Sequence, residues 1–409
     1  MKFLNVDTLE QAREKLLFYG IPYLLRTKHI PLQNARGKTL AQDTIAPCDV
    51  PHFRRSTVDG YAVLAKDTAA ARESIPTFLT QIGAVEMGAL TSDVLHSGLC
   101  MQVPTGGMVP DGADAVVMVE YTESFGTDGV AVYQSVAAGE NVIQIGEDIG
   151  RGGTLLHRGK RLIPQDIGAL AAIGVTQVPV YDSPKVSIFS TGDELISPDA
   201  SPKTGEIRDI NSYTLAAIAQ THDFSVLHTE ALPDMETILE AKLRQAMADS
   251  DIVFVSGGSS RGEKDKTADV IQTVATPGIF TQGLALKPGK PTILGYDASS
   301  ETLLVGLPGH PAAALFVFEL LFGWLQRALR ETPEPPPIPG TLTCNISGGQ
   351  GRLVCCLCTI TWTEAGYAVD PIFSKSGHIT GLVEADGYFL LGRDTEGLIQ
   401  GQHVLVHLF

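Results

Sequence analysis

Short apolar segments alternate with longer amphipathic segments in the second half of this chain. From Lys185 onward, short apolar runs at 186–190 and 251–255 alternate with longer amphipathic segments at 211–221 and 235–248. Short apolar runs predict buried strands, and apolar positions three and four residues apart predict helices. Because strands alternate with helices here, the pattern predicts an α/β unit, with a parallel-type sheet and helices on both of its faces.

The rest of the chain has a different pattern of apolar and polar positions. Residues 46–138 carry short strand patterns separated by glycine turns, which predicts a compact β-rich unit. Residues 1–45 begin with a helix, and residues 139–182 mix helical and extended patterns. The proline-rich segment 332–340 predicts a stiff linker, and the strand patterns that follow it predict a small β-barrel or sandwich. The fold class expected is therefore multidomain α/β plus β.

Charge and length narrow the classes of function. The 409 residues include 46 acidic and 30 basic ones, which gives a net charge of −16. Such a surface repels nucleic acid and anionic membranes, so we expect neither as a partner. The start of the chain carries Asp7, Glu10 and Glu14, which is not typical of a signal peptide, and the apolar stretch 312–329 includes charged residues. We expect a buried helix in that stretch and a soluble, cytoplasmic protein.

A cluster of cysteines invites a metal-site interpretation. Cys344, Cys355, Cys356 and Cys358 lie close together, and Cys355 and Cys358 have C-x-x-C spacing. No second such pair exists, and residues 352–362 have the pattern of a strand. We therefore expect these thiols to fill a core.

Three tight glycine turns carry the most informative chemistry. Each follows a short apolar run, so each is expected at the end of a strand, where backbone N–H groups can approach an anion. Lys287 and Lys290, held between prolines, supply positive charge, and Asp265 supplies a carboxylate. Carboxylates beside a phosphate site usually indicate Mg²⁺. The turns lie at residues 256–260, 287–291 and 306–311.

A further strand end carries Asp193 and Glu194, which could hold a metal or a ligand hydroxyl, or simply cap a helix. Arg208 is available to an anion, and Asn211 could cap the next helix. His310 could act as a general acid or ligand, or could only shape its turn. In the β-rich unit, the polar turns at 54–61 and 102–107 are by themselves ordinary hairpin turns.

Taken in order, these motifs resemble the molybdopterin molybdenumtransferase family, to which the C-terminal domain of gephyrin also belongs. The similarity runs nearly from end to end of the chain. The motifs that carry it are residues 56–63, 104–107, 112–117, Glu120, 146–150, 190–195, 205–211, 257–260, Asp265, 287–291, 306–309, 376–382 and 385–387.

The resemblance implies an elongated subunit of four domains. Domain I would combine residues 1–45 with 139–182 and form the dimer. The β-rich domain II (46–138) would be inserted in it, followed by a molybdopterin-binding α/β domain III (183–331) and a domain IV (332–409) made of the linker and a β-barrel. The family works as a homodimer, with its active cleft between domain III of one subunit and domain II of the other.

The resemblance also implies the reaction, in which molybdate or tungstate enters adenylylated molybdopterin while the phosphoanhydride to AMP is cleaved. Phosphoanhydride cleavage depends on charge neutralisation more than on covalent catalysis. A molybdopterin adenylyltransferase and apo-molybdoenzymes would be further partners. The site residues implied are Asp265, Asp59 and Glu194 for catalysis; Thr105, Arg208, Gly257, Gly258, Ser259, Ser260, Lys287, Lys290, Pro308, Gly309 and His310 for the substrate and its phosphates; and Asp193, Glu194, Asp265 and Asp148 for Mg²⁺.

The chain departs from the family pattern at three places. Ser259 lies in a turn where many relatives have Gly-Val-Ser, His310 replaces an asparagine, and Gly283 lies about where many relatives have a lysine. These departures bear on the choice of oxoanion and pterin. Two alternatives to the transferase are a diverged nucleotide-cleaving hydrolase and a dimeric scaffold of the same fold that binds a peptide partner.

Overall fold

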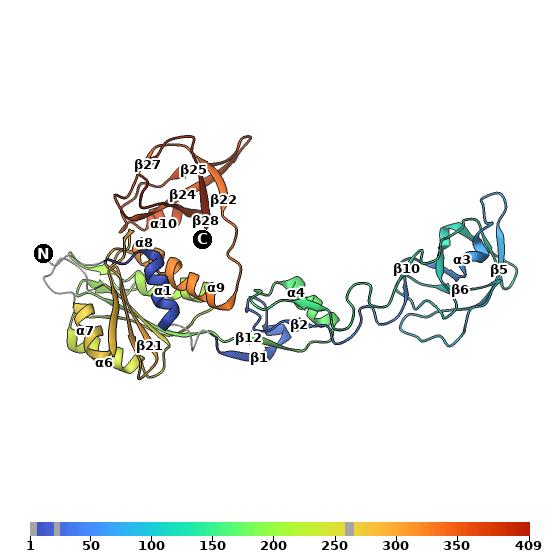
Figure 1. Cartoon of the computed structure of the whole chain (residues 1–409), viewed down its shortest axis with the longest axis horizontal. Coiled ribbons are helices and arrows are strands. Elements are labelled where there is room, and N and C mark those ends of the chain that lie inside the picture. Colours follow the sequence, from blue (N-terminus) through green and yellow to red (C-terminus); the bar gives the residue numbers. More distant parts are fainter. Residues whose placement is uncertain (1–5, 20–24, 258–265) are drawn as a thin grey trace.

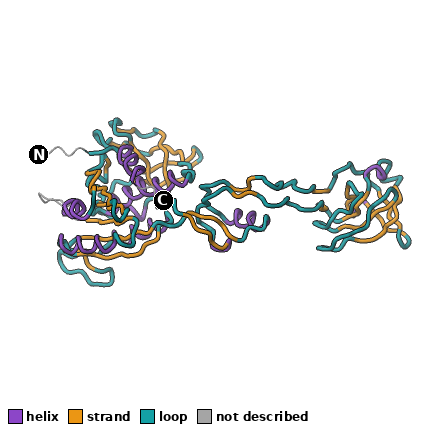
Figure 2. Tube along the Cα trace, turned by 60° about the horizontal axis from the view of Figure 1, so that its bottom comes forward, coloured by secondary structure: helices purple, strands orange, loops and turns teal. Residues whose placement is uncertain are grey.

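The chain forms an elongated assembly of several units (Figure 1). The computed structural model describes residues 6–19, 25–257 and 266–409. An α/β unit and a C-terminal barrel lie together at one end, a small mixed unit lies in the middle, and a β-rich unit lies at the other end, as a second view also shows (Figure 2). The multidomain α/β plus β fold predicted from the sequence is confirmed.

A six-stranded sheet forms the centre of the α/β unit. The first four strands across it are parallel. The fifth runs antiparallel to them, and the sixth is antiparallel to the fifth and so runs in the same direction as the first four. The sequence predicted the parallel part, and the antiparallel pair extends it at one edge. In order across the sheet the strands are β16 (Ser225–Leu232), β13 (Lys185–Thr191), β17 (Ile252–Gly257), β21 (Thr302–Leu307), β20 (Ile293–Asp297) and β18 (Pro277–Gln282).

The central strand β17 explains why helices cover both faces of this sheet. Ile252 and Phe254 pack into one core, and Val253 and Val255 pack into another, because successive side chains of a strand point to opposite faces. Helices α5 (Asn211–Thr221) and α8 (Pro311–Val317) contribute to the first core, and α6 (Glu236–Ala246) and α7 (Lys266–Val274) contribute to the second. A strand that is apolar on both sides therefore requires a helix layer on each.

The N-terminal helix α1 (Leu9–Tyr19) belongs to the core of the α/β unit. Its buried residues Leu9, Ala12 and Leu16 belong to the same core as β13 and α5, and the helix itself contacts the helical residues 318–330. The sequence grouped residues 1–45 with 139–182, and this grouping does not extend to α1. The apolar spacing within the helix indicates that one face is buried, but it carries no information about which unit covers that face.

Residues 311–330 form a continuous helical stretch made of α8, a π-helical segment (Phe318–Gly323) and α9 (Trp324–Arg330). It is long and apolar enough to cross a membrane, but 67% of its most apolar part is buried inside the protein. A buried core helix passes the same test of length and composition. Its position under the sheet agrees with the buried helix predicted from the sequence.

Five strands close the C-terminal barrel in the order β24–β25–β22–β28–β26, with β26 pairing again with β24. The short strand β19 (Leu286–Lys287) of the α/β unit adds to β24 in parallel and so joins the two units. The barrel strands are β22 (Ile338–Leu342), β24 (Leu353–Thr363), β25 (Gly366–Pro371), β26 (Gly387–Leu391) and β28 (His403–Leu408).

The cysteines of β24 serve packing. Cys355 belongs to the core shared with the α/β unit, whereas Cys356 and Cys358 face the barrel interior. Burial raises the pKa of Cys356 to about 11 and that of Cys358 to about 12. Both thiols therefore keep their protons at neutral pH, and a protonated thiol is a poor metal ligand.

The middle and distal units are built from short strands. The middle unit pairs β1 (Thr27–Pro31) with β12 (Gln177–Tyr181) and carries helix α4 (Pro164–Ala172). The distal unit is a six-stranded sheet in the order β7–β4–β6–β5–β9–β8. Its strands are β4 (Gly60–Val63), β5 (Thr77–Ala84), β6 (Leu99–Val103), β7 (Ala115–Met118), β8 (Thr122–Phe125) and β9 (Gly129–Val132). The boundaries of the four predicted domains remain predictions.

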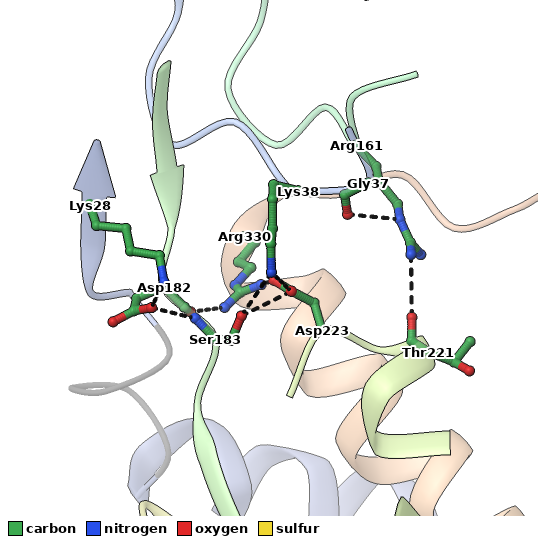
Figure 3. Close-up of polar contacts among 9 residues, drawn as sticks. All are labelled: Lys28, Gly37, Lys38, Arg161, Asp182, Ser183, Thr221, Asp223 and Arg330. Carbon is green, nitrogen blue, oxygen red and sulfur yellow. Dashed lines mark hydrogen bonds and ion pairs between the residues drawn. The ribbon is translucent and has the colours of Figure 1, made fainter. Parts of the chain in front are cut away.

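A buried polar cluster fixes the middle unit to the α/β unit (Figure 3). The guanidinium of Arg330, only 1% exposed, donates to the Asp182 carbonyl at 2.5 Å and to the Asp223 carboxylate at 3.3 Å. Asp223 also accepts from Lys38 of the middle unit at 2.5 Å and from Ser183 at 2.9 Å. Burial lowers the pKa of Arg330, and the Asp223 charge opposes that shift. One carboxylate therefore joins three segments that are far apart in the sequence.

We predict that Asp223→Asn destabilises the protein by about 3 kcal/mol, because it leaves the buried Arg330 charge without its carboxylate. Asparagine tolerates the left-handed backbone of this position, where φ is 59°. Urea unfolding measures the loss. The matched control is Lys28→Ala, which removes an ion pair to Asp182 that is 45% and 41% exposed, and it should cost no more than about 1 kcal/mol. Equal losses in the two variants would contradict the role given to Asp223.

Candidate functional site

A pocket of about 760 Å³ opens at the carboxyl ends of the parallel strands. All four parallel strands contribute to it, since its wall includes residues that end or follow β13, β16, β17 and β21. In open α/β sheets, ligands bind at this edge. The lining residues are Ser190, Thr191, Gly192, Glu194, Leu195, Ile207, Arg208, Asp209, Ile210, Asn211, Asp234, Ser256, Gly257, Pro291, Pro308, Gly309, His310, Pro311 and Gly377.

Asn211 holds two strand ends together at the pocket wall. Its side-chain amide nitrogen donates to Ser256 Oγ at 2.7 Å and to the Gly309 carbonyl at 2.8 Å. The Ser256 hydroxyl in turn donates to the Pro308 carbonyl at 3.2 Å. The prediction that Asn211 caps α5 is wrong: it is the first residue of the helix, and Asp209 accepts from the Ser212 N–H near that end.

Two polar atoms at this wall lack a hydrogen-bond partner among the residues that the structure describes. Asn211 Oδ1 and Thr191 Oγ1 are both buried without one, and their residues are only 9% and 6% exposed. The two donor bonds of the Asn211 amide fix its orientation, so the oxygen cannot exchange places with the nitrogen without losing both. A buried polar atom without a partner costs about 1–3 kcal/mol. Such atoms at a pocket wall are typical of a site that a polar ligand completes.

Gly257 ends β17 at the base of the pocket. Its φ is +114°, and a side chain there would place its Cβ 2.3 Å from the Thr191 carbonyl oxygen. Both observations require glycine at this position. At Gly257, the backbones of β17 and β13 therefore lie too close together for any side chain to fit between them.

Carboxylates dominate the charge of the described pocket wall. Glu194 follows β13, and a methyl group at Gly192 would lie 2.7 Å from its carboxylate. Asp193 accepts from the Asp234 N–H at 3.0 Å, and Asp234 forms an ion pair with Lys266 at 2.9 Å. Among the residues that the structure describes, no group of three or more His, Cys, Asp or Glu could hold a metal ion. Any metal here would thus take most of its ligands from water and the substrate.

Positive charge lies at the pocket's edge. Arg208 lines the pocket, and its Nε donates to the Ala200 carbonyl at 3.2 Å. Lys287 and Lys290 are exposed just before Pro291, which lines the pocket. Within residues 6–19, 25–257 and 266–409, neither lysine side chain makes an ion pair. Both ammonium groups are therefore available to an anionic ligand.

Only some of the predicted site residues line the pocket. Glu194, Arg208, Gly257, Pro308, Gly309 and His310 line one pocket, with Asp193, Lys287 and Lys290 near it in sequence. Gly258, Ser259, Ser260 and Asp265 lie outside the described residues. Asp59, Thr105 and Asp148 do not line the pocket.

Asp59 precedes β4 and Thr105 follows β6, so both belong to the distal β-rich unit. This unit lies at the opposite end of the molecule from the α/β unit that carries the pocket (Figure 1). The Thr105 N–H donates to the Asp59 carboxylate at 2.7 Å. Asp148 is exposed on the connection between the distal and middle units, between β10 (Val142–Ile143) and β11 (Thr154–Leu156). Within one chain, these residues therefore do not meet the pocket.

Sequence reasoning missed Asp234 and Gly377. Asp234 follows β16, an edge strand whose residues 227–231 are mostly exposed, so its sequence lacks the apolar run that revealed the other strands. A helix predicted directly after it was the only available signal. Gly377 comes from the barrel, and nothing in its local sequence indicates contact with the α/β unit.

Gly283, one of the positions at which the sequence is expected to depart from the family pattern, is constrained by the backbone. Its φ is +97°, and a side chain there would bring its Cβ within 2.9 Å of Val6. Its carbonyl accepts from the Asp7 N–H at 3.0 Å. Glycine therefore permits the N-terminal segment to pack closely on this loop.

Comparison with known proteins covers almost the whole chain. Residues 7–174 match the MoeA N-terminal region (domain I and II), residues 187–327 match a probable molybdopterin binding domain, and residues 339–409 match the MoeA C-terminal region (domain IV). The three matches follow the order of the motifs from which the resemblance was predicted.

Individual relatives match along most of their length. A molybdopterin molybdenumtransferase of Haemophilus influenzae is 33% identical over 85% of this chain and 84% of its own. A putative molybdopterin biosynthesis protein of Methanocaldococcus jannaschii is 30% identical over 99% of this chain and 98% of its own. The crystal structure of a molybdopterin biosynthesis moeA protein from Pyrococcus horikoshii superposes with a TM-score of 0.85 at 30% identity, covering 99% of this chain and 100% of that one. The chain therefore belongs to the MoeA family, which includes the molybdopterin molybdenumtransferases of molybdenum cofactor biosynthesis.

Proposed function

We propose that this protein is a molybdopterin molybdenumtransferase that inserts molybdate or tungstate into adenylylated molybdopterin and releases AMP. The observation that carries the proposal is the strand-end pocket, in a segment that matches a molybdopterin binding domain. Its volume of about 760 Å³ lies in the usual range for pockets that bury a small ligand. The unpartnered Asn211 and Thr191 atoms supply hydrogen-bonding capacity for such a polar ligand.

The pocket's residues suit cleavage of a phosphoanhydride by charge neutralisation. Lys287 and Lys290 would hold phosphate or oxoanion oxygens, and Arg208 of the pocket wall would add a further positive charge. The backbone N–H groups of the turn that begins at Gly257 would add neutral donors. Negative charge develops on the phosphate oxygens of AMP as the phosphoanhydride bond breaks, and these donors would stabilise that charge. No nucleophilic serine or cysteine is required.

Mg²⁺ fits the carboxylates present. Glu194 and Asp193 would hold it, with Asp265 as a further ligand of this proposal, and the ion would neutralise charge on the substrate phosphates. Mg²⁺ usually keeps several waters and takes one or two protein carboxylates together with phosphate oxygens. One carboxylate on the pocket wall, that of Glu194, and the adjacent Asp193 suit that mode of binding.

We further propose that the protein acts as a homodimer whose cleft is completed by the partner's distal unit. Asp59 and Thr105 carry a polar, exposed turn far from the pocket of their own chain. Contact with the pocket of a second copy, with Asp148 lining the same cleft, gives these residues a role in the reaction. A molybdopterin adenylyltransferase would supply the adenylylated substrate, and apo-molybdoenzymes would receive the product in the cytoplasm.

Oxoanion-dependent AMP release tests the proposed reaction. With Mg²⁺ and adenylylated molybdopterin, we predict that the protein releases AMP only when molybdate or tungstate is added. Glu194→Gln should lower the rate roughly 10-fold or more, because it removes a charge from the Mg²⁺ ligands. The control, Glu240→Gln, alters a carboxylate of α6 that pairs only with Arg244 on the helix surface and should keep full activity. Release that is independent of both oxoanions would refute the transferase and favour the hydrolase.

Lys287→Ala should raise KM for adenylylated molybdopterin about 5- to 10-fold, because one charge-assisted contact to the substrate is lost. The fold should survive, since β19 pairs with the barrel through its backbone. Lys242→Ala removes an exposed lysine of α6 that pairs with Glu230, and it provides the matched control. An unchanged KM in Lys287→Ala would remove this lysine from the substrate site.

A further inference from the structure

One residue of the pocket wall, Gly377, comes from the C-terminal barrel. The turn between β21 and α8 carries His310, and the barrel segment 374–378 meets it just before α10 (Thr380–Glu384). His310 Nδ1 and Ser376 Oγ are 2.7 Å apart. Two units separated by a proline-rich linker are thus joined by a side-chain hydrogen bond at the rim of the pocket.

The position of Ser376 is set by its backbone. Its carbonyl accepts from the Ala312 N–H at 3.3 Å, so the barrel segment is tied to the start of α8. The His378 N–H donates to the Lys375 carbonyl at 2.8 Å and closes a turn around Ser376. Because these bonds do not involve the serine side chain, its hydroxyl is held in place and remains available to His310.

The backbone of His310 is held from the opposite side. The preceding residues, Pro308 and Gly309, give their carbonyls to Ser256 and Asn211. Among the residues that the structure describes, the imidazole itself makes no hydrogen bond other than that to Ser376. Rotation of the ring about its own bonds is therefore restrained chiefly by Ser376.

The other edge of the ring faces the wall of the pocket. A methyl group on Gly377 would lie 3.7 Å from His310 Cδ2 and 3.9 Å from Nε2, and both residues line the pocket. With Nδ1 bound to the serine, Nε2 is the nitrogen left for a ligand. Gly377 lacks a side chain, so this approach is open.

We propose that Ser376 is a positioning residue, which orients His310 so that Nε2–H donates to an anionic oxygen of the substrate. This inference rests on the proposed function, whose substrate carries phosphate and oxoanion oxygens. When the serine hydroxyl donates to Nδ1 of the neutral ring, the ring proton lies on Nε2. In the imidazolium form both nitrogens carry protons, with the serine oxygen accepting from Nδ1. In both forms Nε2 is a donor.

A double-mutant cycle with the full-length protein tests this assignment. We expect Ser376→Ala to raise KM for adenylylated molybdopterin about 3- to 10-fold, the effect of one weakened hydrogen bond, with kcat nearly unchanged. His310→Phe, which keeps a ring without donors, should raise KM at least as much. Adding Ser376→Ala to His310→Phe should then change KM no further, because the serine acts through the histidine. Ser376→Thr, which keeps the hydroxyl, should restore most of the affinity.

The controls separate this proposal from the proposed function. Ser347→Ala alters another barrel serine and should leave KM unchanged. If the unaltered protein releases no AMP with either oxoanion, the proposed function fails, and the positioning role falls with it. If the unaltered protein is active but the effects of Ser376→Ala and His310→Phe multiply in the double variant, or Ser376→Thr behaves like Ser376→Ala, the positioning role alone is overturned.

Discussion

The arrangement of this protein depends on one buried charge. Arg330 ends the last helix of the α/β unit and lies almost wholly inside the protein, where its desolvation is compensated by the Asp182 carbonyl and the Asp223 carboxylate. Lys38 of the middle unit uses the same carboxylate. Since removing one partner of a buried ion pair costs far more than breaking a surface pair, the junction resists bending. This cluster therefore sets the orientation of the middle unit relative to the α/β unit.

That orientation separates two polar sites. The pocket lies where four parallel strands end. Its wall combines carboxylates with two polar atoms that have no partner among the described residues, and Lys287 and Lys290 come just before Pro291 of that wall. Asp59 and Thr105 lie at the opposite end of the molecule. The proposed homodimer would bring the distal unit of a second copy to this pocket.

The layers of the fold were well predicted from the sequence, because a buried strand or helix face requires apolar residues at regular local spacing. Helix α5 occupies the predicted residues 211–221, and β17 with its two apolar faces was evident from its unbroken apolar run. Contacts between units leave no such local trace. The packing of α1 on the α/β unit, the antiparallel edge strands and the barrel's Ser376 at the pocket all depend on residues far apart in the chain.

Site residues could be predicted from the sequence where they directly follow a strand that the sequence also predicted. Glu194, Gly257 and His310 follow apolar runs, and the structure places all three at one pocket. Asp234 follows an exposed edge strand, and its position could not be inferred from hydrophobic pattern. The distal residues Asp59 and Thr105 were assigned through resemblance to a family, since their turn alone is an ordinary one.

The most direct test of the shared cleft is complementation between two inactive variants. Asp59→Asn removes the distal charge while its remaining oxygen can still accept from the Thr105 N–H, and Glu194→Gln disables the pocket. In a purified mixed dimer, one cleft carries both changes and the other carries neither. AMP release should therefore return to about half of the activity of the unaltered dimer. No recovery in mixed dimers that form normally would show that each site is built within one chain and would contradict the account.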